Sequence, residues 1–125
     1  MKKVIATNNA PAAIGPYSQA IEVNGFLYIS GQIPVDPSTG EFVPGGIKEQ
    51  TAQSFRNIKA ILAEAGLTID NVVKTTVLLA DIADFAAMNE VYATQFEGAF
   101  PARSAFAAKA LPKGALVEIE VIAAR

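Results

Sequence analysis

The pattern of hydrophobic and polar positions predicts a β-hairpin near the start of the chain. Two short runs, 20–23 and 26–30, are rich in apolar and aromatic residues and flank Asn24-Gly25. This dipeptide supplies the two positive φ angles of a type I′ turn. The next segment, 31–46, is rich in proline and glycine and predicts a surface loop, long enough to be functional.

The spacing of apolar residues then changes to that of a helix, predicted from Ile47 to Ala65. Its apolar residues fall at spacings of three, four or eight and form one stripe: Ile47, Phe55, Ile58, Leu62 and Ala65. The polar residues lie mostly off this stripe: Glu49, Gln50, Gln53, Arg56 and Lys59. Gly66 is expected to end the helix as a left-handed cap.

A strand, a second helix and a final hairpin complete the predicted elements. Residues 72–79 are β-branched and long enough for a strand. A helix is expected after Asp81 or Asp84, ending before Gly98, with one face made of Phe85, Met88, Tyr92 and Phe96. The last strands are predicted at 102–110 and 116–123, joined by a tight turn over 111–114.

This order of elements predicts one domain, residues 1–125, of the α/β class: a mixed sheet with two helices on one face. Two helices leave the other face bare. The final strand nevertheless places apolar residues on both faces, with Val117, Ile119 and Val121 opposite Leu116 and Ile122. We expect another copy of the chain to bury the bare face. The alternative is ordinary scattered surface apolar residues.

Composition and charge narrow the class of protein. Hydrophobic residues make up 51% of the chain and charged residues 18%, which excludes disorder as the overall state. The net charge is −2 and the basic residues are scattered, so nucleic acid is not an expected partner. No apolar run approaches 18 residues, so we expect no membrane span and a cytoplasmic protein.

The chain has no Cys and no His. This excludes disulfides, thiolate nucleophiles, Ser-His-Asp triads and nearly every zinc or transition-metal site, so no metal is expected. Arg103 follows Pro101-Ala102 and can hold a carboxylate through two parallel hydrogen bonds. Glu118 and Glu120 share one face, where partial burial would raise a carboxyl pKa and suit it to orient or deprotonate water. A surface ion pair and a solvated polar stripe remain the alternatives.

Two weaker candidates lie earlier in the chain. Tyr17 sits in a rigid turn that can present its phenol to a cleft, or it can be a packing aromatic. Ser30 and Gly31 lie where a strand ends and backbone amides become free, which suits an anion.

The geometry of the predicted last hairpin also gives the distance between Arg103 and Glu118. With its turn centred near Lys113, the residue opposite Arg103 is about Ala123, and Glu118 lies about five residues along the strand. At ~3.3 Å per residue the separation is ~15–20 Å. Arg103 and Glu118 of one chain therefore cannot share a small ligand, and they can cooperate only across a subunit boundary.

Several segments, in order and over essentially the whole chain, resemble the RidA/YjgF/YER057c/UK114 family. The most specific are Pro101-Ala102-Arg103-Ser104, Leu111-Pro112 and Val117-Glu118-Ile119-Glu120. The others are Gly15-Pro16-Tyr17-Ser18-Gln19-Ala20, Ser30-Gly31-Gln32-Ile33-Pro34, the 53–66 helix with Asn57, Val73-Lys74-Thr75-Thr76-Val77, and Asp84-Phe85 with Asn89 and Tyr92.

The resemblance implies a chorismate-mutase-like fold and a homotrimer with three ligand clefts between subunits. It implies a reactive-intermediate deaminase, a 2-iminobutanoate/2-iminopropanoate deaminase. Such an enzyme hydrolyses enamines and imines such as 2-aminoacrylate and 2-aminocrotonate to 2-keto acids and ammonia. These intermediates are released by pyridoxal-phosphate-dependent dehydratases, and the deaminase itself would need no cofactor.

The resemblance also assigns roles to single residues. Arg103 would clamp the substrate carboxylate and Glu118 would hold and activate the attacking water. Four residues would complete the pocket: Tyr17, Ser30, Gly31 and Asn89. Ala105 stands where the family usually has Cys; a backbone role survives this change, because any residue supplies the same N–H and C=O, whereas a thiol role does not.

The family also includes proteins of other function. Some are described as translation inhibitors with ribonuclease activity, some as chaperone-like proteins and some as binders of small molecules. A 2-keto-acid-binding or regulatory protein without turnover is therefore an alternative that the same arginine cleft would serve. An endoribonuclease is a second alternative, which the charge distribution disfavours.

Overall fold

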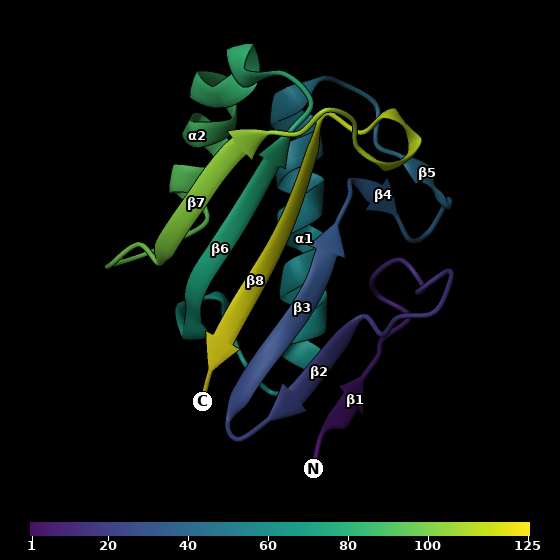
Figure 1. Ribbon diagram of the computed structural model, residues 1–125, viewed down its shortest axis with the longest axis vertical. Helices are drawn as coiled ribbons and strands as arrows, with labels where there is room; N and C mark the ends of the chain where they lie inside the picture. The colour runs from purple at the N-terminus through teal and green to yellow at the C-terminus, as the bar shows by residue number, and fades with distance from the viewer.

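A computed structural model describes residues 1–125, and in it a twisted six-stranded sheet lies in front of two helices (Figure 1). The strands, in their order across the sheet, are β1 (Lys3–Ile5), β2 (Ala20–Val23), β3 (Phe26–Gln32), β8 (Val117–Ala124), β6 (Val72–Leu79) and β7 (Ala102–Ala107). The helices are α1 (Ile47–Glu64) and α2 (Phe85–Thr94). Only β6 and β7 are parallel. The predicted mixed sheet with two helices on one face is confirmed.

The predicted first hairpin is confirmed. Strands β2 and β3 are antiparallel, and Val23 pairs with Phe26 across a two-residue turn. Asn24 and Gly25 have φ angles of 52° and 81°, the positive pair that a type I′ turn requires. Strand β1, which the sequence pattern does not predict, extends the sheet beyond β2.

Helix α1 begins at the predicted residue, and Gly66 takes the expected left-handed conformation, with a φ of 74°. The prediction that its polar residues lie off the packed face is wrong for Gln50 and Gln53, which are buried. Gln50 accepts a hydrogen bond from the backbone N–H of Leu116 (2.9 Å), and Gln53 donates one to Asn57 (2.9 Å). Burial is tolerated because these polar groups are hydrogen-bonded.

The segment 31–46 contains more regular structure than predicted. Strand β3 extends to Gln32, and two short strands, β4 (Val35–Asp36) and β5 (Glu41–Phe42), form a small hairpin. The buried Asn57 of α1 donates hydrogen bonds to the carbonyls of Ile33 (3.2 Å) and Val35 (2.9 Å). A long-range contact, invisible in local pattern, therefore orders the start of this segment.

The strand at 72–79 and the second helix are confirmed. Asp81 caps a short 3-10 helix, Ile82–Asp84, by accepting from the N–H of Ala83, and α2 follows directly. Two further 3-10 turns span Ile69–Asn71 and Pro112–Gly114. Phe96 lies beyond the end of α2 and is still buried in the core.

The predicted last hairpin is wrong. Strands β7 and β8 do not pair, because β6 lies between them, parallel to β7 and antiparallel to β8. The end of β6 is hydrogen-bonded to the segments that flank it on both sides. The carbonyl of Leu79 accepts from the N–H of Ala108 (2.8 Å), and the N–H of Ala80 donates to the carbonyl of Leu116 (3.0 Å). Since α2 carries the chain from β6 to β7, β7 lies parallel beside β6, as in other strand–helix–strand units.

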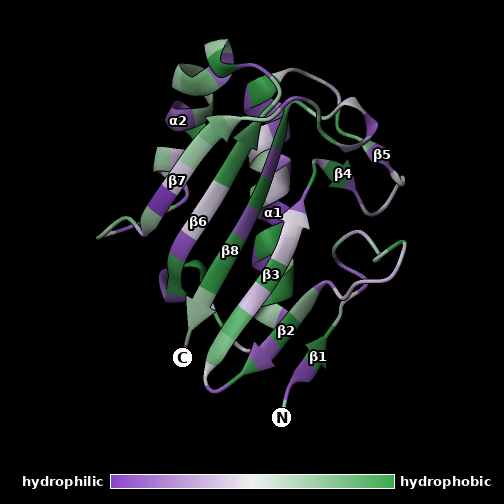
Figure 2. Cartoon of the chain, in the orientation of Figure 1, coloured by the Kyte–Doolittle hydropathy of each residue, from purple (hydrophilic) through white to green (hydrophobic).

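The two faces of the sheet differ. Alternate residues of β8, namely Val117, Ile119, Val121 and Ala123, are buried against the helices, which confirms the predicted shared face of the first three. The residues between them face the open side, which carries exposed apolar side chains of neighbouring strands: Val4, Phe26, Tyr28 and Phe106. Figure 2 shows hydrophobic and hydrophilic residues interspersed along these strands. Neither helix is long and apolar enough to cross a membrane.

Candidate functional site

Arg103 lies at the edge of the sheet, on β7, and reaches α2. Its Nη1 donates a 2.7 Å hydrogen bond to Oδ1 of Asn89. Its guanidinium carbon lies 4.7 Å from the centre of the Tyr92 ring and 5.4 Å from that of Phe85. Arg103 is exposed and forms no ion pair, so its remaining N–H groups are available to an anion.

Glu118 lies on β8 and faces the open side of the sheet, beside Gly31 of β3. Between the pairs Ile29–Val121 and Gln32–Ile119, β3 has one residue more than β8, which is the signature of a β-bulge. A Cβ on Gly31 would overlap the Glu118 carboxylate, lying 2.8 Å from its Cδ. Glycine is thus the residue that leaves room for this carboxylate.

The electrostatics of Glu118 suit it to proton transfer. Burial raises the pKa of Glu118 above its usual value, and the nearby Glu120 carboxylate raises it further. Neither Glu118 nor Glu120 forms an ion pair or accepts a side-chain hydrogen bond from the protein. Glu118 is therefore a half-buried carboxylate whose oxygens remain available to water or a ligand.

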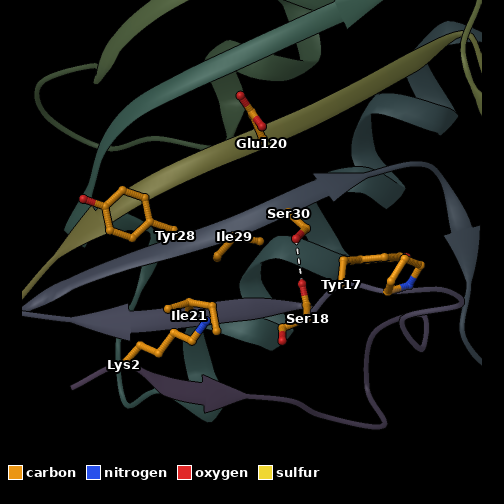
Figure 3. A pocket seen from close by; sticks show the side chains of 9 residues that line it. Lys2, Tyr17, Ser18, Ile21, Tyr28, Ile29, Ser30 and Glu120 are labelled. Atoms are coloured by element: carbon orange, nitrogen blue, oxygen red, sulfur yellow. Dashed lines mark hydrogen bonds between the residues drawn. The ribbon is translucent and has the colours of Figure 1, made fainter.

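Tyr17 and Ser30 line a hollow of about 470 Å³ on the open side of β3 and β8 (Figure 3). The hydroxyl of Ser30 donates a 2.6 Å hydrogen bond to the carbonyl of Ser18, drawn as a dashed line in Figure 3. Since its single proton is used there, Ser30 can offer a ligand only its acceptor lone pairs. Glu120, on β8, lines the same hollow.

The structure thus gathers the candidates into two groups. Arg103 and Asn89 meet at the β7–α2 edge. On the open side, Gly31 and Glu118 meet at the β3–β8 bulge, and Tyr17 and Ser30 line the hollow that contains Glu120 but not Glu118. The groups lie on opposite sides of the sheet. Arg103 of β7 pairs with Thr75 of β6, which pairs with Val121 of β8, and both of these partners are buried against the helices. Glu118 instead pairs with Leu78, whose side chain faces the open side.

The separation of Arg103 and Glu118 follows from this register rather than from the hairpin that the sequence predicts. The two residues lie two strands apart and three residues out of line. At ~4.8 Å per strand and ~3.3 Å per residue, their Cα atoms are roughly 14 Å apart. The premise of the hairpin measurement is wrong, but its conclusion stands: within one chain these side chains point to opposite sides and cannot share a small ligand.

Sequence reasoning missed the residues that hold the candidates in place. Phe85 and Tyr92, which the sequence places on the apolar face of the second helix and among the segments of the family resemblance, also contact Arg103. Their spacing with Asn89, four and then three residues, places all three on one helix face and is the signal that was available. Glu120 was noted only as a neighbour of Glu118. The structure brings together no group of three or more acidic side chains able to hold a metal ion.

Comparison with known proteins decides the family. The family model described as Endoribonuclease L-PSP matches residues 7–125. The chain belongs to the RidA/YjgF/L-PSP family. A relative from Mus musculus, 2-iminobutanoate/2-iminopropanoate deaminase, is 56% identical over 123 residues, covering 98% of this chain and 91% of its own.

Solved structures of other RidA/YjgF/L-PSP proteins share the whole fold. A Rid family protein of unknown function, YyfA from Yersinia pestis, superposes with a TM-score of 0.97 at 56% identity and covers 100% of both chains. Escherichia coli TdcF with bound serine superposes with a TM-score of 0.94 at 44% identity, over 98% of both chains. The candidate site is thus built on a RidA/YjgF sheet, in which Ala105 packs partly buried on the helix side of β7.

Proposed function

We propose that this protein is a 2-iminobutanoate/2-iminopropanoate deaminase. It would hydrolyse reactive 2-imino acids and their enamine forms, such as 2-aminoacrylate and 2-aminocrotonate, to 2-keto acids and ammonia. The observation that carries the proposal is the 56% identity, over 98% of the chain, to a relative with this name. The site supports it with an unpaired arginine for the substrate carboxylate and a half-buried carboxylate for water.

The reaction asks for one water molecule and no redox change. Water adds through its oxygen to the imine carbon, R–C(=NH)–COO⁻, and one of its protons passes to nitrogen. The hydroxyl proton of the tetrahedral adduct then passes to its amino nitrogen, the C–N bond breaks and ammonia leaves, and the hydroxyl oxygen becomes the keto oxygen of R–CO–COO⁻. Carboxylate binding, water placement and one proton transfer suffice, and general acid–base help is typically worth about 10²–10⁴-fold.

Arg103 binds the substrate carboxylate in this proposal. Asn89 occupies one of its five N–H donors, so four remain for a fork of two parallel hydrogen bonds to a carboxylate. This fixes the plane of the 2-imino acid, because its carboxylate and imine are conjugated. The exposed position of Arg103 leaves it accessible to an anion from solvent.

Glu118 holds the attacking water and accepts its proton. The carboxylate is the reactive form, and a raised pKa makes it a stronger base than an ordinary glutamate. Gly31 leaves the space beside it, and Tyr17 and Ser30 complete the wall through the hollow that they line. Ala105 contributes through its backbone on the edge strand β7, a role that needs no thiol.

The two groups work together only if a second copy of the chain completes each site. Arg103 and Glu118 point to opposite sides of one sheet, so a cleft between neighbouring subunits is the arrangement that serves both. We place three such clefts in a homotrimer, with the open face of each sheet directed inward. The exposed apolar residues Tyr28 and Phe106 of that face support this assembly.

A binding protein without turnover and an endoribonuclease are the competing functions. The net charge of −2 and the two glutamates of the site disfavour RNA, whose phosphates require a basic surface. A 2-keto-acid binder would need the same arginine but no carboxylate with a raised pKa. Glu118 is therefore the residue that favours an enzyme over a binder.

One competition assay tests the proposal. A dehydratase generates 2-aminoacrylate from serine, and the release of pyruvate and ammonia is followed with and without this protein. Release faster than the unaided hydrolysis, in proportion to protein concentration, is expected. An unchanged release rate with measurable binding of pyruvate would identify a binder instead. Cleavage of RNA with a steep salt dependence would favour the ribonuclease.

A further inference from the structure

The guanidinium of Arg103 is contacted by two aromatic rings as well as by an amide. Tyr92 lies 4.7 Å and Phe85 5.4 Å from the guanidinium carbon, both distances measured to the ring centre. Asn89 accepts the hydrogen bond at the edge, through Nη1. A planar cation that lies over two rings and donates a hydrogen bond to a third side chain has few orientations left.

Tyr92 is itself fixed from several directions. Its hydroxyl lies 2.7 Å from the hydroxyl of Thr75, and both residues are buried. Its ring packs edge-on against Phe55, with centroids 5.5 Å apart, and tilted against Phe96, 5.1 Å away. The surface under Arg103 is therefore part of the core and does not move independently of it.

We infer that Tyr92 and Phe85 are positioning residues for Arg103: their rings hold the guanidinium plane so that its free N–H groups meet the substrate carboxylate already oriented. The inference rests on the proposed function and deepens it, because it names what aims the carboxylate clamp. An arginine on the surface otherwise samples many rotamers, and a ligand that immobilises it loses affinity. Pre-orientation by α2 removes that loss before substrate arrives.

Tyr92→Leu is the variant that removes the larger ring. We expect KM for 2-iminopropanoate, generated in situ by an amino-acid oxidase, to rise about three- to tenfold, the range of an exposed cation–π contact plus one ordered side chain. We expect kcat to change by less than about twofold, because Tyr92 contacts the arginine that binds the substrate and not the carboxylate that would accept the proton of water.

Two variants separate positioning from general damage to the core. Phe96→Leu removes a ring from the same buried cluster without a cation–π contact to Arg103, so KM should stay near that of the unmodified protein. Tyr92→Phe keeps the ring and removes only the hydroxyl that faces Thr75, so the melting temperature should fall while KM is retained.

The mobility of the Arg103 side chain distinguishes a positioning role of Tyr92 from a merely structural one, because general damage to the core would not change it selectively. The Nε–H groups of Arg56, Arg103 and Arg125 give separate signals in ¹⁵N relaxation experiments. Tyr92→Leu should increase the mobility of Arg103 alone. Arg125 is an internal control, because it is ion-paired with Glu22 far from α2. If Tyr92→Leu does not fold, Phe85→Leu, at a partly exposed position, should give the same change at smaller size.

Unchanged Arg103 mobility in a folded Tyr92→Leu protein, or equal rises in KM for Tyr92→Leu and Phe96→Leu, would overturn the inference. Failure of the proposed function is distinguishable from this result. In that case the unmodified protein would not accelerate imine hydrolysis at all, whereas Arg103 would still become mobile in the variants.

Discussion

At the scale of single residues, the absence of one methyl group decides where the Glu118 carboxylate lies. Gly31 has a φ angle outside the positive range, so other residues can adopt its backbone conformation. A glycine is required there because the Glu118 side chain occupies the space that a Cβ would fill. Gly31 thus acts on the candidate site through shape.

Gly31→Ala should therefore impair activity more than folding. The added methyl group would push the Glu118 carboxylate away from its place at the bulge, and we expect kcat to fall about 10²-fold, as for loss of a general base. Steady-state kinetics and a melting curve check this. Activity close to that of the unmodified protein would show that the carboxylate position is unimportant. Gly46→Ala is the matched control, because no other atom lies near the position of its Cβ. Gly40→Ala is unsuitable, because alanine would be strained at a φ of 76°.

Glu118→Gln should lower kcat at least about 10²-fold while binding of pyruvate is largely kept, since the amide cannot accept the proton of water. In the unmodified protein, activity should fall as pH drops through the raised pKa of Glu118. Glu120→Gln removes the neighbouring negative charge, so the acidic limb of its pH profile should move to lower pH. Loss of pyruvate binding in Glu118→Gln would instead make Glu118 a structural residue.

The same variant has a stability signature. A carboxyl group whose pKa is raised by folding stabilises the native state below its unfolded pKa, near 4.5, and this contribution is lost as pH rises through the folded value. Glu118→Gln, which stays neutral, should therefore melt at a higher temperature than the unmodified protein at pH 7. The difference should shrink towards zero below pH 4.

At the scale of elements, the loop before β2 is held by one buried side chain. The amide of Gln19 accepts from the N–H of Thr7 (2.7 Å) and donates to the carbonyls of Thr7, Ala10 and Pro11. Ser30 adds a bond to Ser18 in the same loop. The loop that carries Tyr17 is therefore fastened to the sheet by these polar contacts, together with the buried Ala10.

Gln19→Leu should detach this loop. Four backbone partners lose their bond and several become unsatisfied, so we expect a loss of about 2–4 kcal/mol in the free energy of unfolding. Urea denaturation measures this free energy. Faster amide hydrogen exchange at Thr7 and Ala10 would show that the loss of stability arises in this loop. Gln95→Leu, at an amide with only side-chain and helix-end bonds, is the matched control. Equal losses for the two variants would contradict the proposed role of Gln19.

At the scale of the whole molecule, the two halves of the proposed site lie on opposite sides of one sheet. Arg103 reaches the helix side at one edge, and Glu118 faces the open side next to β3. If neighbouring subunits join these halves, each protomer contributes to two different clefts. An active site of this kind depends on association, because a separated chain would have both groups and no complete cleft.

Mixing two inactive variants tests this arrangement. Arg103→Ala and Glu118→Gln should each lose activity, Arg103→Ala through loss of substrate orientation with its fold intact. Co-refolded in equal amounts, they should recover about a quarter of full activity, the fraction of clefts that receive both intact residues. Native mass spectrometry should show three copies per particle. Absence of recovery in mixed trimers would show that Arg103 and Glu118 do not act across the interface.

The sequence by itself determined most of the local structure. Asn24-Gly25 fixed the first hairpin, the spacing of Phe55, Ile58 and Leu62 defined α1, and the alternation in β8 correctly assigned its two faces. These are short-range properties, in which a residue's own backbone preference or the helix or strand period carries the information. The candidate residues Arg103 and Glu118 were also available, from their chemistry and from the family resemblance.

Only the tertiary structure decided which strands pair and what holds each candidate. The tight turn over 111–114 predicts a hairpin, but β6 lies between β7 and β8 because α2 returns the chain to the edge of the sheet. The burial of Gln50 and Gln53, and the rings under Arg103, likewise depend on partners distant in the chain. Strand order and side-chain partners are set by packing between segments. The local pattern of apolar residues shows that a strand or helix must pack against another element, but it does not identify that element.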